Sequence, residues 1–423
     1  MTYQKGFFYS IMWNVAPSDG KARLIQIKME KKIKLGVFGF GCVGQGLYSV
    51  LLQTRGINAE IKKICIKHPE KKRPIDASFF TTSRDEILND PEIDVVVELI
   101  DEVEAAFEIV SSALRRKKAV VSANKKMIAE NFKALLELQR TFNTPFLYEA
   151  SCCASIPVIR NLEEYYDNDL LTSVEGILNG STNYILTQIF EHGQKFNEAL
   201  KRAQELGFAE SDPSLDVKGL DPKYKLLIIL VHAFGIILKP DDIFNYGIQN
   251  LKNADIGYAR EKNASIKLIA KCKKLDNKVI AYCMPRFVAL SDTLNKVTYE
   301  YNGLLMEGAF SEHQFFMGKG AGGNPTGSAV LSDISALTYQ YRYEYKKLSQ
   351  HLNYTFTQDV DLEVYVSYDS TVIPDPDDFK SISVRHGSPG FNYLIGKINL
   401  SRLKQSRWMH HESISLVLTE NNA

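Results

Sequence analysis

Residues 33–44 read Ile33-Lys-Leu-Gly-Val-Phe38 followed directly by Gly39-Phe-Gly41-Cys-Val-Gly44, and this stretch decides the fold of the 423-residue chain. The first six residues predict a buried strand, and residues 45–55 predict a helix. A strand, a Gly-x-Gly-x-x-Gly turn and a helix in this order are typical of a dinucleotide-binding fingerprint. A chance match in a loop is the alternative, and the flanking elements disfavour it.

The glycines of this turn have separate expected roles. Gly39 permits the tight turn, Gly41 lets the backbone approach a pyrophosphate, and Gly44 lets the helix pack close to the strand. The free N–H groups at the helix start would face the phosphates. Cys42 and Val43 are therefore expected cofactor contacts together with the three glycines.

The end of the next expected strand, residues 59–66, bears on the choice of nicotinamide cofactor. Enzymes that prefer NAD usually place Asp or Glu there to hold the ribose hydroxyls. This strand instead ends next to Lys67, with the basic run 71–73 close behind. Such cations favour a 2′-phosphate, so we expect NADP, with NAD left open. The alternative is a solvated basic loop, and Glu70 weakens the inference.

Strands and helices then alternate as in a doubly wound parallel sheet. Residues 93–100 form a near-continuous apolar run of the kind buried on both faces of such a sheet. Lys125 follows the expected strand 119–123, at the strand end where open α/β sheets bind ligands. It is expected to polarise a carbonyl or anchor a carboxylate, the alternative being a solvated side chain. The other expected elements are helices 104–116 and 127–142 and strand 145–150.

Acids and lysines converge in residues 210–225, just before the apolar run 226–234. Asp221 before Pro222 predicts an N-cap with proline at the first helical position. Lys225 lies four residues on, so the two side chains can meet on one helix face. Partial desolvation beside a second cation would help Lys225 release a proton, while Asp221 would oppose this release. The alternative is a capped helix with one surface ion pair.

Between these regions, residues 151–157 are mostly small, and Glu149 just before them is an acid that needs a partner in an apolar stretch. Residues 174–178 predict a strand, and 179–183 predict a polar turn into helix 184–191. Helix 197–206 is expected to stop at Gly207.

The composition excludes several classes of protein. Lys plus Arg total 51 against 50 Asp plus Glu, which gives no field for nucleic acid or a membrane surface. No apolar run approaches the length of a bilayer span, and no secretory signal is recognisable, so we expect a cytoplasmic protein of two or three domains. The six cysteines lack metal-ligand spacing and predict buried free thiols. Residues 1–30 are expected to be an accessory extension or the result of an upstream start codon.

The chain resembles homoserine dehydrogenase, which interconverts aspartate semialdehyde and homoserine in threonine and methionine biosynthesis. The resemblance covers about residues 32–341. It implies a Rossmann-type doubly wound parallel sheet, discontinuous in sequence, an α+β substrate and dimerisation domain, and a small C-terminal α+β appendage. The implied boundaries are 31–155, 156–319, 320–341 and 342–423. The motifs that carry it are the glycine turn, Ser122-Ala-Asn-Lys125, Gly176-Ile-Leu-Asn-Gly-Ser-Thr-Asn-Tyr184, residues 210–225 and Gly318-Lys-Gly-Ala-Gly-Gly-Asn-Pro-Thr326.

The resemblance also implies roles for individual residues. It makes Lys225 the proton donor and Lys125 its partner at cofactor and substrate. A monovalent cation, usually sodium, would bind at Glu149 and at main-chain carbonyls nearby, and the family usually forms homodimers or homotetramers. The remaining implied positions are Glu210, Asp216, Asp221 and Ser181 at the substrate, Gly207 and Gly322 at the cofactor, and the carbonyls of Cys152, Ala154 and Ile156 at the cation.

Three positions depart from the family pattern. Asp101-Glu102 replace a frequent Gly-Gly pair, Ala154-Ser155 replace another, and Ser181 replaces a threonine. Within residues 342–423, the segment 360–366 alternates like a half-buried strand, and 393–403 predicts a strand and a short helix. This region lacks the Asp-x-Pro-Gly turn of the family's ligand-sensing module, so threonine feedback is disfavoured and left open. Two alternative functions stay open: a related dehydrogenase of another small aldehyde or keto acid, and a non-catalytic dinucleotide sensor, which would not need the two lysines.

Overall fold

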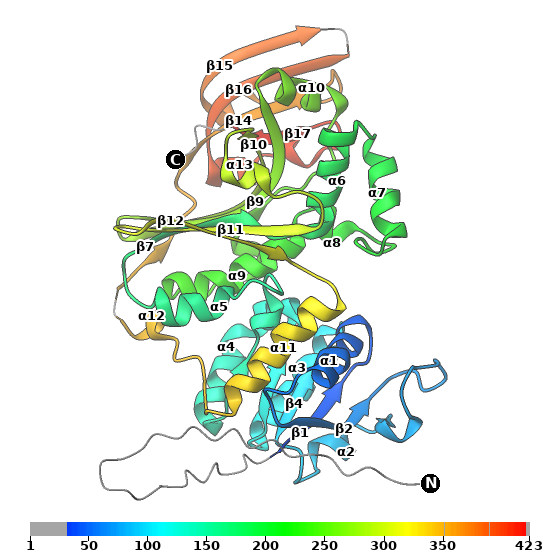
Figure 1. The fold of residues 1–423 in the computed structure, drawn as a ribbon. Helices are drawn as coiled ribbons and strands as arrows, with labels where there is room; N and C mark the ends of the chain where they lie inside the picture. Colours follow the sequence, from blue (N-terminus) through cyan, green and yellow to red (C-terminus); the bar gives the residue numbers. More distant parts are fainter. Residues whose placement is uncertain (1–31, 351, 389, 420–423) are drawn as a thin grey trace, which may run out of the picture. The chain divides into compact units, whose positions relative to one another are not determined.

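The computed structural model describes residues 32–350, 352–388 and 390–419. The expected extension at residues 1–30 lies outside these ranges. Two sheets organise the described residues: a six-stranded parallel sheet and an eleven-stranded mixed sheet (Figure 1). The α/β class with a doubly wound parallel sheet and a second α+β region is confirmed.

The parallel sheet has the strand order β3-β2-β1-β4-β5-β6. The direction of winding reverses between β1 and β4, and ligands of open α/β sheets bind at such a switch point. All four residues of β4 are buried, as its apolar sequence predicts. The strands are β1 (Ile33–Phe38), β2 (Ala59–Cys65), β3 (Phe80–Thr81), β4 (Val95–Glu98), β5 (Ala119–Ser122) and β6 (Phe146–Leu147).

Helices α1 (Cys42–Gln53) and α11 (Gly323–Leu337) come from distant parts of the chain and pack together, blue beside yellow in Figure 1. The contact is so close that a Cβ atom on Gly46 would lie 1.9 Å from the carbonyl oxygen of Gly323. The chain therefore returns to the parallel sheet after leaving it. The other helices of this region are α2 (Asp85–Leu88), α3 (Val103–Arg115) and α4 (Lys125–Phe142).

The mixed sheet has the order β12-β11-β7-β9-β10-β17-β14-β16-β15, and β8 and β13 also pair with β10. Its strands before residue 350 are β7 (Leu171–Ile177), β8 (Phe244–Asn245), β9 (Ala264–Leu275), β10 (Lys278–Ala289), β11 (Tyr301–Gly308) and β12 (Glu312–Lys319). The helices of this region are α5 (Val158–Arg160), α6 (Gly180–His192), α7 (Phe196–Glu205), α8 (Ser214–Val217), α9 (Leu220–Phe234), α10 (Asn253–Glu261) and α12 (Lys346–Ser349).

The C-terminal strands continue the mixed sheet instead of forming a sheet of their own. Strand β17 pairs with both β10 and β14, and Tyr282 and Met284 of β10 share one hydrophobic cluster with Leu416 and Leu418. Strands β14 and β16 and helix α13 match the sequence prediction, whereas β15 and β17 were not predicted. The elements are β13 (Thr355–Phe356), β14 (Asp361–Tyr368), β15 (Phe379–Ser388), β16 (Phe391–Asn399), α13 (Leu400–Gln405) and β17 (Ser415–Leu418).

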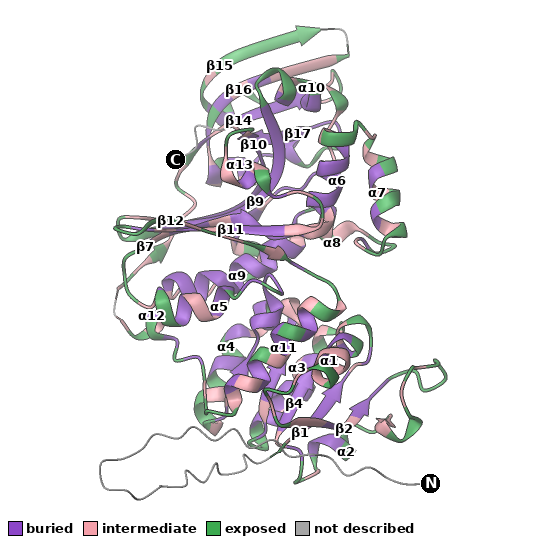
Figure 2. Cartoon of the chain, viewed as in Figure 1, coloured by how far each residue is buried: buried purple, intermediate pink, exposed green. Residues whose placement is uncertain are grey.

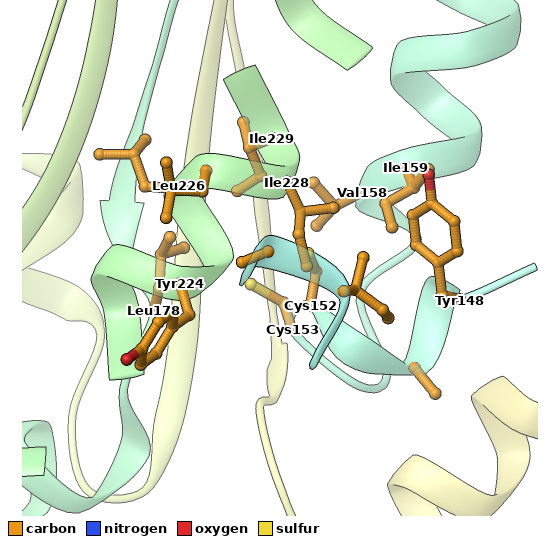
Figure 3. Close-up of a cluster of buried hydrophobic side chains, with 14 of the residues drawn as sticks. Tyr148, Cys152, Cys153, Val158, Ile159, Leu178, Tyr224, Leu226, Ile228 and Ile229 are labelled. Carbon is orange, nitrogen blue, oxygen red and sulfur yellow. The ribbon is translucent and has the colours of Figure 1, made fainter. Parts of the chain in front are cut away.

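Helix α9 carries Asp221 and Lys225, the acid and the lysine singled out in the sequence. Every residue from Asp221 to Phe234 is buried, which Figure 2 shows as an unbroken purple helix. Figure 3 shows Ile228 and Ile229 of this helix in one apolar cluster with Cys152 and Cys153. The predicted buried helix is confirmed, and its apolar sides hold its polar N-terminal turn in place.

Several predicted boundaries were wrong. Helix α9 has Gly219, with φ of +73°, as its N-cap, so Asp221 does not cap it. Helix α6 begins at Gly180 and not at 184, and α1 begins at Cys42, whose thiol is exposed and not buried. Strand β6 stops at Leu147 because a 3₁₀ turn follows at Glu149–Ser151. Within the described ranges, no helix combines the length and apolarity needed to cross a bilayer.

Candidate active site

A pocket of about 590 Å³ opens at the carboxyl ends of β1, β2 and β4. Gly39 and Gly41 line it on the β1 side, and residues 99–102 line it on the β4 side. This is the switch point of the sheet, where the strand order predicts a ligand crevice.

The glycine turn fits a dinucleotide. Gly39 has φ of +96°, and a Cβ there would meet the carbonyl oxygen of Leu99 at 2.5 Å. A Cβ on Gly44 would meet the carbonyl oxygen of Gly39 at 2.6 Å, so α1 packs tightly against the turn. A Cβ on Gly41 would meet no atom within 4 Å. Gly41 thus faces open space, as required where a pyrophosphate approaches the backbone.

Basic side chains form a rim of the pocket close to the end of β2. Lys67, Lys71 and Arg73 line it as predicted, and Arg84 also lines it. Lys67 pairs with Glu102 at 2.5 Å, and both side chains are exposed. The acid at this departure from the family pattern therefore neutralises one cation of the rim.

Glu98 ties the end of β4 to the end of β5. This fully buried acid accepts hydrogen bonds from Ser122 Oγ (2.5 Å) and from the N–H of Ile100 (2.8 Å). Ser122 Oγ also accepts a bond from the N–H of Asn124 (3.1 Å). Burial raises the pKa of Glu98 to about 7. The turn that carries Lys125 therefore rests on a buried carboxyl group.

The two lysines singled out in the sequence meet at one acid. Asp221 lies 2.9 Å from Lys125 Nζ through one carboxylate oxygen and 2.9 Å from Lys225 Nζ through the other. The Lys225 side chain is 8% exposed, whereas that of Lys125 is 37% exposed. Lys225 also donates to the carbonyl oxygen of Leu178 (2.5 Å). Among the described residues these acceptors take two of its three N–H bonds, which leaves one for a further acceptor.

The charges in this cluster support one another. Burial alone would raise the pKa of Asp221, but Lys125 and Lys225 hold it well below its usual range. The charge of Asp221 in turn raises the pKa of Lys125 against the effect of burial. Asp221 is therefore ionised and Lys125 is charged at neutral pH.

The other expected substrate residues lie at different distances from this centre. Asp216 is joined to Asp221 through Asn179, whose Nδ2 donates to both carboxylates at 2.7 and 2.8 Å. Ser181 Oγ donates to the carbonyl oxygen of Phe208 (2.5 Å). The carboxylate of Glu210 is exposed and contacts neither lysine within the described part of the chain. The structure thus joins Asp216, but not Glu210, to the acid that the two lysines share.

The two other glycines that we expect at the cofactor lie at helix ends. Gly207 has φ of +75° and follows α7, so the predicted stop is confirmed. Gly322 has φ of +110° and is the N-cap of α11. Both positions are hard for a residue with a side chain to adopt.

The Glu149 carboxylate caps a helix. It accepts hydrogen bonds from the N–H groups of Val158 (2.6 Å), Ile159 (2.9 Å) and Arg160 (2.8 Å). Burial, followed by the charge of Asp333, raises the pKa of Glu149 to about 7. The described residues contain no group of three or more His, Cys, Asp or Glu side chains that could hold a metal. A cation in this loop would therefore need main-chain oxygens.

Three residues of the site were missed at the sequence level. Asn179 was read as part of a polar turn, although asparagine before Gly-Ser-Thr is a standard helix-capping signal. Glu98 was visible as an acid that ends an apolar strand, which predicts a required partner. Arg84 gave no signal, because it approaches the pocket from a loop that no motif marks.

Comparisons with known proteins agree along the chain. The family model for homoserine dehydrogenase matches residues 157–335, and the model for the homoserine dehydrogenase NAD binding domain matches residues 39–149. Homoserine dehydrogenase of Helicobacter pylori is 37% identical over 316 residues, 72% of this chain and 74% of that protein. The Bacillus subtilis enzyme is 34% identical over 321 residues, 74% of each chain.

Solved structures show the same relationship. A homoserine dehydrogenase from Thiobacillus denitrificans has a TM-score of 0.81 at 25% identity, covering 92% of this chain and 98% of that chain. The S. aureus homoserine dehydrogenase at pH 7.5 has a TM-score of 0.70 at 27% identity, covering 93% and 100%. The chain belongs to the homoserine dehydrogenase family, the oxidoreductases that interconvert L-aspartate 4-semialdehyde and L-homoserine.

Proposed function

We propose that Lys225 is the proton donor of this reaction and that Lys125 is its partner beside the substrate carbonyl. The observation that carries the proposal is the Lys125–Asp221–Lys225 cluster, in which both ammonium groups lie 2.9 Å from one buried acid. A reduced nicotinamide, when bound, supplies the hydride that the aldehyde carbon accepts. The lysines supply positive charge and a proton for the oxygen of that carbonyl.

The remaining N–H of Lys225 is the donor in this proposal. Its other two N–H bonds go to Asp221 and to the carbonyl oxygen of Leu178, so the ammonium group has one orientation. A donor held in a fixed direction costs little reorganisation when charge develops on the carbonyl oxygen. Lys125 is more exposed and reaches the same oxygen from the side of the parallel sheet.

Acids beside the lysines fit a substrate that carries an amino group. We assign Asp216, Asp221 and Glu210 to the amino acid end of the substrate, with Ser181 as a hydroxyl at the same edge. Asp216 and Asp221 are both in the cluster, while Glu210 is exposed and free to face a ligand. A non-catalytic sensor would need none of these groups next to two lysines, and family membership does not favour that alternative.

The cofactor is assigned to the pocket at the switch point, with a preference for NADP over NAD. The glycine turn, with Cys42 and Val43 at the start of α1, would hold the pyrophosphate, and Gly207 and Gly322 would border the ligand. Lys67 and the neighbouring basic side chains would receive a 2′-phosphate. The pairing of Lys67 with Glu102 reduces this charge, so we expect a moderate preference.

The cofactor preference is tested with Lys67→Ala. The KM for NADP should rise about 10- to 150-fold, since one phosphate contact to a charged group contributes about 1.5–3 kcal/mol. The KM for NAD should not change, because NAD lacks the phosphate. An equal rise in both KM values would contradict the assignment.

A monovalent cation, sodium being the first candidate, is assigned to the loop after Glu149. Because the Glu149 carboxylate caps α5, the ligands would be main-chain oxygens, with those of Cys152, Ala154 and Ile156 as the leading set. Such hard oxygen donors suit an alkali ion. The rate in sodium chloride compared with choline chloride at equal ionic strength tests this assignment.

We propose a homodimer formed through the mixed sheet, with a homotetramer as the alternative, and we keep the domain boundaries 31–155, 156–319, 320–341 and 342–423. On the outermost strand β12, Phe315 and Met317 are 36% and 53% exposed. Exposed apolar side chains on a sheet edge are typical of a surface that is covered by a partner. Light scattering after size-exclusion chromatography, with Met317→Lys as the disrupting variant, measures the subunit number.

The whole proposal has one direct test. Purified protein is mixed with homoserine and NADP, and the absorbance of the reduced nicotinamide is followed. A panel of other small hydroxy acids is assayed in the same way. Reduction of NADP by homoserine that is lost in Lys225→Ala supports the proposal. Equal rates with and without Lys225, in a folded variant, would refute it.

A further inference from the structure

Asn179 lies between the two acids of the site. Its Nδ2 donates to Asp216 Oδ1 at 2.7 Å and to Asp221 Oδ2 at 2.8 Å, and the residue is 4% exposed. One side-chain amide therefore uses both of its N–H bonds to hold two carboxylates from two different helices, α8 and α9.

The other end of the same amide is also occupied. Oδ1 of Asn179 accepts hydrogen bonds from the N–H and the Oγ1 hydroxyl of Thr182, both at 2.8 Å. Reversing the amide would point its oxygen at two carboxylates and its NH₂ at the N–H group of Thr182. The orientation is therefore determined by the partners, and it joins the acids to the first turn of α6.

We propose that Asn179 is a positioning residue for this site, which holds Asp216 and Asp221 together so that Asp221 stays between Lys125 and Lys225. The inference rests on the proposed roles of the two lysines and adds a residue that controls them. Asn179 itself needs no contact with the substrate or the cofactor. Asn179 acts by fixing the position and the ionised state of Asp221, the acid that both ammonium groups share.

Electrostatics explain why an amide is required at this position. The charged groups that face it are Asp216 from α8, Asp221 and Lys225 from α9, and Lys125 from α4. Burial and the charge of Asp221 raise the pKa of Asp216, and the hydrogen bond from Asn179 opposes this rise. Without a neutral donor between them, the two carboxylates would repel each other and move away from the lysines.

The decisive variant is Asn179→Asp, which keeps the shape of the side chain and the acceptor for Thr182. Aspartate is also a good N-cap, so α6 should form normally. The variant loses both donors and adds a third negative charge. We expect kcat at pH 8 to fall about 100-fold, the cost of a misplacement of about 1 Å, with the KM for NADP unchanged. Activity should recover in part as the pH falls, because a protonated carboxyl group again donates a hydrogen bond.

A second variant and a matched control separate positioning from folding. Asn179→Ser keeps the helix cap but is too short to reach both acids, so kcat should fall while the unfolding temperature changes little. Asn399 is the control, because it caps α13 through Ser401 and its Nδ2 donates to Asp359 and Asp361 at 2.9 and 3.4 Å. Asn399→Asp changes a similar arrangement in the C-terminal strands, and its kcat should equal that of the unchanged protein.

The outcomes are distinct. Loss of activity in Asn179→Asp with recovery at lower pH, and none in Asn399→Asp, supports the inference. A folded Asn179→Asp with normal kcat and an unchanged pH profile overturns it if Lys225→Ala is inactive. If Lys225→Ala is active as well, the proposed function of the whole cluster fails, and the positioning role fails with it.

Discussion

Replacing Lys225 with alanine tests the centre of the site most directly. The Lys225 side chain is 8% exposed, and its Nζ lies 2.9 Å from Asp221, so the ammonium group is held in place inside the protein. General-acid help of this kind contributes about a hundred- to ten-thousand-fold in rate. We therefore expect kcat to fall by that range, which equals about 3–5 kcal/mol of transition-state free energy.

The protein should remain folded in this variant. Asp221 keeps Lys125 and Asn179 as partners, and the carbonyl oxygen of Leu178 keeps a hydrogen bond from Asn302 (3.1 Å). No buried charge is left alone, so the free energy of unfolding should fall by only about 1–3 kcal/mol. Thermal unfolding of the variant measures this loss independently of activity.

A neighbouring lysine of the same helix gives the matched control. Lys223 is also buried, and its charged neighbours are Asp241 and Lys404, which are not members of the Lys125–Asp221–Lys225 cluster. The assay follows nicotinamide absorbance with homoserine at saturating cofactor for Lys223→Ala and Lys225→Ala. A folded Lys225→Ala with kcat within tenfold of the unchanged protein, or an equal loss in both variants, would refute the reasoning.

Three further perturbations test the fold and the electrostatics. Glu98→Gln should flatten the pH dependence of stability. In the unchanged protein, a Glu98 pKa raised from 4.5 to about 7 lowers the free energy of unfolding by about 3 kcal/mol as the pH rises from 4 to 8. Denaturant titrations of both proteins across that range measure the difference. Gly46→Ala should destabilise by at least about 3 kcal/mol, because the new methyl group meets the backbone of Gly323, whereas Gly257→Ala in open space should stabilise by about 0.5–1 kcal/mol; equal melting temperatures would contradict this. Asp221→Asn should cost about 3–5 kcal/mol, since the buried Lys225 and the partly exposed Lys125 lose their shared counter-charge; a melting temperature equal to that of the unchanged protein would exclude this.

Much of the parallel-sheet domain was predictable because its signals are local. The glycine turn identified β1, the turn and α1 together, and alternating apolar strands and amphipathic helices gave the remaining elements. Lys125 could be placed at a strand end for the same reason. The place of the ligand pocket then follows from the rule that ligands bind where the winding of an open sheet reverses.

The Asp221 prediction shows where local reasoning stops. An acid before proline is a standard N-cap signal, and only the fold reveals a lysine 96 positions away in sequence that competes for the same carboxylate. Its pairing with Lys225, four residues on, was confirmed because helical spacing fixes it. The order of the C-terminal strands was not predictable, because β17 pairs with strands whose identity depends on the whole sheet.

The position of β17 has a consequence for how the polypeptide is made. It lies between β10 and β14 in the sheet, yet it is translated after every other strand of that sheet. Until residues 415–418 have been synthesised, β14 has an unpaired backbone edge along residues 364–367, and Arg286 of β10 lacks its strand partner, although β8 and β13 pair elsewhere along β10. The apolar side chains of these strands that share a cluster with Leu416 and Leu418 are then uncovered, and unpaired edges and exposed apolar surface promote aggregation of nascent chains. Shortened products that stop before residue 415 are therefore expected to be substrates for chaperones and proteases, although all residues of the Lys125–Asp221–Lys225 cluster are already present in them.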